Sequence, residues 1–135
     1  IYNLNFNDDY VCQLLVFLLV DEANNFKRWK EEFKELFKGD RIVLLFGSAI
    51  KNYEHASDID LMITMEKKEL KEINSVIKKK AMILPKRIHS IQLTITDLSK
   101  NIEKRDKAIL DIIKNGVVLY GQESYLEVLK NVTSA

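Results

Sequence analysis

The spacing of apolar residues along the chain switches between a helical period and an alternating period, which predicts both helices and strands. Residues 1–7, "IYNLNFN", alternate between apolar and polar and are predicted to form a short strand or an extended lead-in. A helical pattern comes next over residues 8–20, and Asp8 or Asp9 is placed to cap it. The chain therefore begins with a lead-in and an apolar helix.

A second helix is predicted over residues 22–38, with Gly39 placed to end it. Large side chains recur on it at helical spacing and form one stripe. The stripe consists of Phe26, Trp29, Phe33, Leu36 and Phe37. We interpret it as core packing, and a face that binds a partner protein is the alternative.

Beyond residue 40, short apolar runs and helical patterns alternate. The predicted elements are, in order, strands over 41–46 and 59–65, a helix over 67–80, a strand over 86–96, a helix over 97–115, an extended piece over 117–121 and a helical segment over 123–132. Asp97 is placed to cap the long helix and Gly116 to end it. This interleaving favours an α/β (α+β) domain, in which a sheet is layered with helices.

Composition narrows the class of protein. With 135 residues, of which 47% are hydrophobic, the chain is long enough for one domain with a sizeable core. Its net charge of +1 gives no field strong enough to indicate nucleic acid by itself. The apolar run over 11–20 is too short to cross a bilayer, so no membrane partner is expected. The lone Cys12 favours a reducing compartment, and we expect a cytoplasmic protein.

The stretch "LLFGSAIKNYEHASDIDLMI", residues 44–63, carries the candidate chemistry. Because side chains alternate across a strand, Asp58 and Asp60 face the same way, with Cα atoms about 6.6 Å apart. Ile59 and Leu61 then point into the core. Two carboxylates on one face of a strand can hold divalent cations such as Mg²⁺ or Mn²⁺, and such ions bind substrate phosphates.

The Gly47-Ser48 turn supplies the second half of the predicted site. A glycine at the end of a strand lets the backbone approach a phosphate closely. The Ser48 hydroxyl and the amides at the start of a following helix can donate hydrogen bonds to phosphate oxygens. The turn and the aspartates lie at the ends of neighbouring strands in this prediction, so together they could hold a nucleoside triphosphate and its metal ions.

These residues bear a resemblance to a known family. The paired motif "FGS…SDIDLMI" resembles the nucleotidyltransferase superfamily of the DNA polymerase beta type, and in particular its minimal nucleotidyltransferases. The matching residues are Gly47, Ser48, Ser57, Asp58, Asp60 and Leu61. The segment "IIKNGVVLYG" is also similar to the C-terminal part of such domains, so the resemblance covers about residues 41–121. On this basis residues 1–38 are a lead-in with helices, and 39–135 are the nucleotidyltransferase-like domain, treated together as one compact unit.

The resemblance implies a fold, a reaction and partners. It implies a short mixed sheet flanked by helices, with phosphate contacts from Gly47, Ser48, Lys51 and Ser57. It implies a Mg²⁺-dependent transfer of a nucleoside monophosphate, often AMP from ATP, to a hydroxyl of a protein, RNA or small molecule. The acceptor is in some relatives a helical toxin of the HEPN type, and such domains can act as antitoxins. The lead-in is similar to the segment that comes after a winged-helix DNA-binding module in some relatives, and a start at Ile1 rather than Met fits a piece of a longer protein.

The sequence departs from the family pattern in three ways. Nine residues separate Ser48 from Asp58 where ten is usual, and Lys51 stands where the family commonly has arginine. The family's third carboxylate, which helps bind the catalytic metal and can accept a proton, has no acidic counterpart on the strand over 86–96.

Gln92 occupies about the position of that third carboxylate, with Ser90 and Thr94 on the same face, whereas His89 points the other way and is interpreted as structural. The absence of an acidic residue at the position of the third carboxylate supports a second hypothesis. The chain could be a catalytically degenerate module that binds a nucleotide or a partner and has a regulatory role, with a DNA-binding domain attached.

Overall fold

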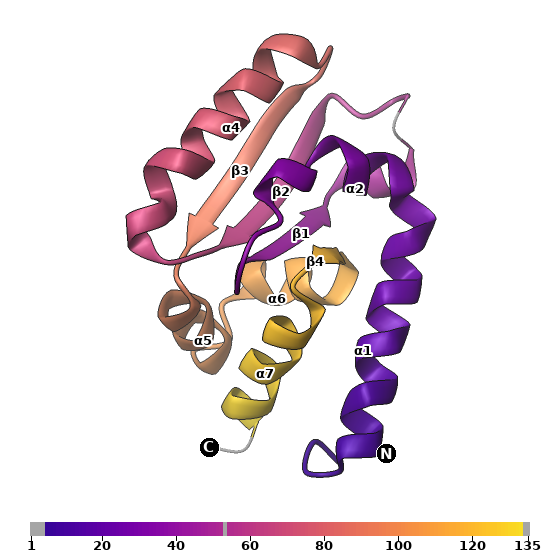
Figure 1. Ribbon diagram of the computed structural model, residues 1–135, viewed down its shortest axis with the longest axis vertical. Helices are drawn as coiled ribbons and strands as arrows, with labels where there is room; N and C mark the ends of the chain where they lie inside the picture. Colours follow the sequence, from indigo (N-terminus) through magenta and orange to yellow (C-terminus); the bar gives the residue numbers. More distant parts are fainter. Residues whose placement is uncertain (1–4, 53, 134–135) are drawn as a thin grey trace.

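A four-stranded mixed sheet forms the centre of the molecule (Figure 1). The structure is a computed structural model that describes residues 5–52 and 54–133. The strands are β1 (Ile42–Phe46), β2 (Asp58–Thr64), β3 (Arg87–Leu93) and β4 (Val117–Tyr120). Their order is β3-β2-β1-β4, in which β1 runs antiparallel to both of its neighbours and β2 runs parallel to β3. The predicted fold class, a short mixed sheet flanked by helices, is confirmed.

Helices cover both faces and one edge of the sheet. They are α1 (Asp9–Ala23), α2 (Lys27–Glu32), α3 (Ser48–Lys51), α4 (Leu70–Ile83), α5 (Ile95–Glu103), α6 (Lys107–Asn115) and α7 (Gln122–Thr133). Among the described residues, short 3-10 helices flank α2 and precede α4: η1 (Asn24–Phe26), η2 (Lys34–Leu36) and η3 (Lys67–Glu69). Helix α1 lies beside β4 and α7, and α4 lies along β3 (Figure 1). Within the described chain, no helix is both long and apolar enough to span a membrane.

Strands β1, β2 and β4 bury side chains on both faces, which explains their nearly continuous apolar runs, whereas β3 is mostly only partly buried. On one face, Val43, Leu45 and Leu61 pack against α2, η2 and α4. On the other face, Leu44 and Met62 pack against α5, α6 and α7. The sheet therefore separates two hydrophobic cores.

The aromatic stripe of the predicted second helix lies in the first of these cores. Trp29, Phe33 and Leu36 are buried there, so the interpretation as core packing is confirmed for them. Phe37 stacks on Tyr120 with 5.0 Å between the ring centroids. This segment thus packs against the sheet rather than facing solvent.

Two predicted helices are interrupted in the structure. The pattern over 22–38 is not one helix, because η1, α2 and η2 follow one another with irregular joints at Phe26 and Phe33. The pattern over 97–115 divides into α5 and α6 because Arg105 adopts φ +56° and Asp106 starts a new helix. The Asp106 carboxylate accepts from the Ile109 N–H at 3.0 Å, as an N-cap does.

Smaller corrections concern the ends of elements. Helix α5 begins at Ile95 because Thr94 is its N-cap, and Asp97 is the third helical residue of a capping box rather than the cap. Asp8 caps α1, as predicted, by accepting from the Tyr10 N–H. Asn5–Asn7 form a turn rather than a strand, and residues 1–4 of the predicted lead-in lie outside the described residues.

A buried cation connects the loop before β1 to η3 and α4. The Arg41 side chain is 2% exposed, bonds the Leu36 carbonyl and pairs with Glu69 and Glu72. Partial burial raises the pKa of Glu69. Hydrogen bonds from the Glu66 backbone N–H and from Arg41 outweigh it and hold the pKa below its usual range. Hydrogen bonds from Lys38 and Arg41 likewise lower the pKa of Glu72.

Candidate functional site

The two aspartates lie at the start of β2, in the middle of the sheet. Asp60 is paired with Phe46, the last residue of β1, and with His89 on β3. Its side chain points to the same face as Met62, which belongs to the core beneath α5, α6 and α7. Asp58 lies two residues earlier on this face, where the sheet opens to solvent. Asp60 is 20% exposed and Asp58 is 34% exposed, so both carboxylates reach the surface.

The Gly47-Ser48 turn lies directly against Asp60. Gly47 follows the last residue of β1 and adopts φ +80° and ψ −159°, a conformation open essentially to glycine alone. A Cβ atom at this position would stand 2.2 Å from Oδ2 of Asp60. Both the backbone conformation and the available space therefore require glycine, and the structure brings together the turn and the aspartate that the sequence motif paired.

Ser48 is exposed and begins α3, which is only four residues long. A helix this short has no useful macrodipole, so we assign no anion site to its N-terminus. The group available for phosphate at this point is the Ser48 hydroxyl. Lys51 ends α3 and Ser57 immediately precedes Asp58, and both are exposed.

Each aspartate has a basic neighbour on β3. His89 Nδ1 lies 3.3 Å from Oδ1 of Asp60, and Arg87 Nε lies 3.3 Å from Oδ1 of Asp58. Both neighbours are mostly exposed, at 64% for His89 and 81% for Arg87. Surface pairs of this kind are weak, so the basic side chains can move away from the carboxylates without a large cost.

Gln92 does not stand beside the aspartates, which corrects its assignment to the third-carboxylate position. It is paired with Ile63 and therefore faces the opposite side of the sheet. There its side-chain amide donates to Asn74 of α4 at 2.8 Å and to Ser90 at 3.1 Å. The position on β3 next to Asp60 belongs to His89, so the prediction that His89 faces away from Gln92 is confirmed, and His89 lies on the face of the aspartates.

A cavity of about 630 Å³ adjoins the turn. One wall consists of Phe46, Gly47, Ser48 and Lys51, from the end of β1 and from α3. The opposite wall is a face of α6 that carries Ala108, Asp111 and Asn115. No sequence pattern indicates this second wall, because α6 reaches the turn only through the packing of the sheet.

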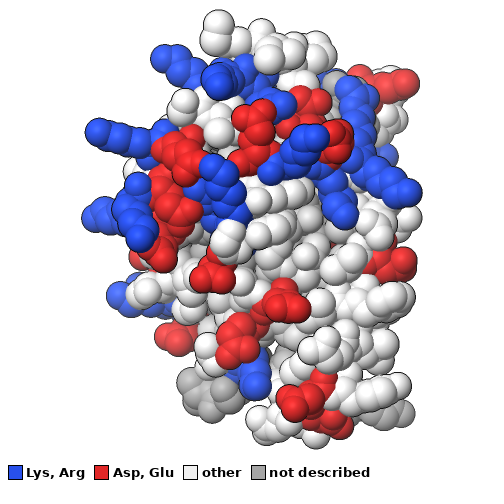
Figure 2. Space-filling view, in the orientation of Figure 1, with Lys and Arg blue, Asp and Glu red and all other residues white. Residues whose placement is uncertain are grey.

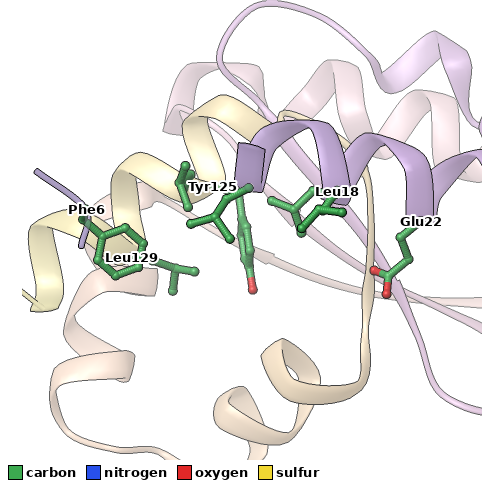
Figure 3. A pocket seen from close by; sticks show the side chains of 8 residues that line it. Phe6, Leu18, Glu22, Tyr125 and Leu129 are labelled. Atoms are coloured by element: carbon green, nitrogen blue, oxygen red, sulfur yellow. The ribbon is translucent and has the colours of Figure 1, made fainter. Parts of the chain in front are cut away.

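A second cavity, of about 290 Å³, lies between α1 and α7 and is lined mostly by apolar side chains (Figure 3). The residues that line it include Phe6, Leu18 and Leu129, and Glu22 lies at one side. Burial, with a smaller contribution from Glu22, raises the pKa of Tyr125 to about 12, so this phenol stays neutral. An apolar cavity with one carboxylate and no cation in its lining cannot bind phosphates.

Charged side chains of both signs are interleaved over the upper half of the face seen in Figure 2. Lys80 Nζ lies 3.4 Å from Oε1 of Glu32. Lys86 donates to the backbone carbonyls of Glu54 and Ala56 and so fastens the loop before β2. Both lysines therefore make contacts within the protein.

The donor set at the aspartates suits a divalent cation that shares its shell with a substrate. Among the described residues, no group of three or more His, Cys, Asp and Glu side chains is placed to hold a metal ion. Mg²⁺, however, commonly takes only one or two carboxylates from the protein and completes its shell with phosphate oxygens and water. Two carboxylates facing one way beside a glycine turn meet that requirement.

Comparison with known proteins agrees with this geometry. A family model described as "Polymerase beta, Nucleotidyltransferase" matches residues 31–125. The matched range contains the turn, both aspartates, β3 and α6, and it encloses the range over which the motif resemblance was seen. Comparisons with curated proteins and with solved structures gave no match.

Proposed function

Because the chain belongs to the polymerase beta nucleotidyltransferase family, we propose that this site transfers a nucleoside monophosphate, AMP from ATP, to a hydroxyl group. Domains of the family generally use a nucleoside triphosphate and a divalent metal ion. The observation that carries the proposal is the contact of the Gly47 turn with Asp60, because it places a phosphate-binding element beside a pair of carboxylates on one strand.

Each residue of the site has a distinct role in this proposal. Asp58 and Asp60 hold Mg²⁺, and the bound ion neutralises charge on the phosphates during the displacement. Gly47 lets the phosphates approach the turn, and the Ser48 hydroxyl donates to a phosphate oxygen. Lys51, in the wall of the adjoining cavity, supplies positive charge to the same group. Ser57 precedes Asp58 and is the further hydroxyl that can donate to a phosphate.

The acceptor we propose is a hydroxyl of a protein, an RNA or a small molecule. A helical protein of the HEPN type is the first candidate to test, with an antitoxin role for this chain, because the sequence motif resembles the minimal nucleotidyltransferases. A cytoplasmic location is consistent with the free thiol of Cys12.

Transfer of label from ATP labelled at its α-phosphate tests the proposal. With Mg²⁺ and a candidate acceptor, wild-type protein should label the acceptor, and the double variant Asp58→Asn/Asp60→Asn should not. Asp40→Asn is a matched control, because Asp40 is an exposed carboxylate just before β1 and outside the site. Label transfer that survives in the double variant would contradict the mechanism.

A specific observation favours a second candidate, a nucleotide-binding module without catalysis. The β3 positions nearest the aspartates carry Arg87 and His89, and β3 contains no acidic residue. In this case the site binds the nucleotide but lacks the carboxylate that accepts the proton from the attacking hydroxyl.

The variant His89→Asp distinguishes the two candidates, because His89 lies where a carboxylate would face Asp60. If the wild-type protein transfers label, the second candidate fails. If the wild-type protein binds ATP without transfer and His89→Asp gains transfer, the second candidate is supported. Gln92→Asp is the matched control, since that side chain faces α4, and it should gain nothing.

A further inference from the structure

We propose that the face of α6 lining the cavity binds the nucleoside part of the nucleotide, with Asp111 and Asn115 as its polar contacts. This inference rests on the proposed function, which places the phosphates at the turn. The cavity of about 630 Å³ falls within the range of small-molecule sites. Ala108, Asp111 and Asn115 follow one face of the helix over about 10 Å, which is close to the length of a nucleoside.

The distribution of charge decides which end of the ligand meets which wall. Ser48 and Lys51 stand on the wall formed by the turn and α3, and Asp111 stands on the α6 wall. A carboxylate without a bound cation repels a triphosphate, whereas Asp58 and Asp60 beside the turn hold Mg²⁺ in the proposed function. The phosphates therefore belong at the turn and the neutral nucleoside belongs at α6. The two walls therefore suit the two halves of one molecule.

Asp111 is available for this role. Its side chain is exposed, and among the described residues its carboxylate has neither an ion pair nor a hydrogen bond. A carboxylate is an acceptor only, and ribose hydroxyl groups are donors. Carboxylates recognise ribose in this way in dinucleotide-binding folds.

Asn115 lies one turn further along the same face. Its Nδ2 donates to the backbone carbonyl of Asp111 at 3.2 Å, which holds the amide in place at the end of α6. The amide still presents one N–H donor and a carbonyl acceptor, a combination that can match the polar edge of a base. Phe46, Ile50 and Ile112 add apolar surface to the same cavity, against which a flat base can pack.

Calorimetric titration with two probes tests the inference. ATP carries the nucleoside and inorganic tripolyphosphate does not, and both are titrated in Mg²⁺. In Asp111→Ala and in Asn115→Ala, we expect ATP to bind about tenfold more weakly. Tripolyphosphate should bind as before, or slightly more tightly once the Asp111 charge is removed. Glu103→Ala, which removes an exposed carboxylate from α5, is the control and should change neither affinity.

Each alternative result has one meaning. Equal changes for both probes, or no change for ATP, would overturn the assignment of α6. Equal affinity of the wild-type protein for ATP and tripolyphosphate would overturn it as well, and would leave the phosphate site intact. A wild-type protein that binds neither probe would overturn this inference and the proposed function together.

Discussion

Substitution of Gly47 by alanine tests the contact on which the site depends. At φ +80° and ψ −159°, an alanine is strained by about 1–3 kcal/mol. The new Cβ would also stand 2.2 Å from Oδ2 of Asp60, where ordinary contact begins at 3.4 Å. The carboxylate must therefore swing away by about 1 Å, and a displacement of this size in an active site can reduce the rate about 100-fold.

The two effects separate in a double-mutant cycle measured by urea unfolding. The backbone strain belongs to Gly47 alone, so it should appear in every background. The collision belongs to the pair, so Asp60→Ala should remove it and leave a coupling energy of about 0.5–1.5 kcal/mol. Asp60→Asn keeps the size of the side chain and is the matched control, because Gly47→Ala should cost as much in that background as in the wild-type protein.

The predicted contact is refuted if Gly47→Ala costs the same free energy of unfolding in the Asp60→Ala background as in the wild-type protein, within about 0.4 kcal/mol. The predicted role of the turn is refuted if Gly47→Ala lowers neither stability nor the affinity for Mg²⁺ and ATP. The first result would mean that the turn and the aspartate do not touch. The second would mean that the conformation of the turn is unimportant to the site.

Three further predictions concern stability, each measured by chemical or thermal unfolding. Gly121→Ala should lower the free energy of unfolding by more than about 3 kcal/mol, because its Cβ would lie 2.1 Å from the backbone carbonyl oxygen of Arg41. Gly39→Ala is the control, because a Cβ there meets open space, and it should cost about 1 kcal/mol. Equal costs for the two variants would contradict the prediction. Arg41→Met should lower the free energy of unfolding by about 2–4 kcal/mol, because Glu69 loses its ion-pair partner. Solvent partly screens the Glu69 carboxylate, which keeps the loss moderate. Because the pKa of Glu69 is lower in the folded protein than its ordinary value of 4.5, the ionised carboxylate stabilises the fold above pH 4.5. This stabilisation is lost as the pH falls through the pKa of the folded state. The loss of stability below pH 4.5 should therefore be smaller in Arg41→Met. Asp106→Ala should cost about 0.5–2 kcal/mol through loss of the α6 N-cap, and no loss would show that the helix starts elsewhere.

The sequence predicted β1 and β2 well because these strands bury side chains on both faces. The apolar runs before Gly47 and after Asp58 became β1 and β2, and the alternation of side chains placed both aspartates on one face. The helix breaks were harder to predict. Nothing in the local pattern marks Arg105 for φ +56°, although Asp106 is a residue type that favours helix starts.

The neighbours of the aspartates could not be predicted from the sequence. Which residue of β3 lies beside Asp60 depends on the register of a parallel pair, and that register is set by packing between distant segments. A shift of one residue exchanges His89 for a residue on the other face. For the same reason, the α6 wall of the cavity is visible only in the folded chain, since Asp111 is far from Gly47 in sequence and both line one cavity.

The proposed function requires Asp58 and Asp60 to bind cation-bound phosphates beside the Gly47 turn. The direct measurement is the affinity for ATP with and without Mg²⁺ in the wild-type protein, in Asp58→Asn/Asp60→Asn and in the control Asp40→Asn. We predict that Mg²⁺ raises the affinity at least about tenfold in the wild-type protein and in the control, and has no effect in the double variant. If the affinity of the wild-type protein for ATP does not depend on Mg²⁺, or if a Mg²⁺ effect persists in the double variant, the two aspartates do not bind the cation of the nucleotide.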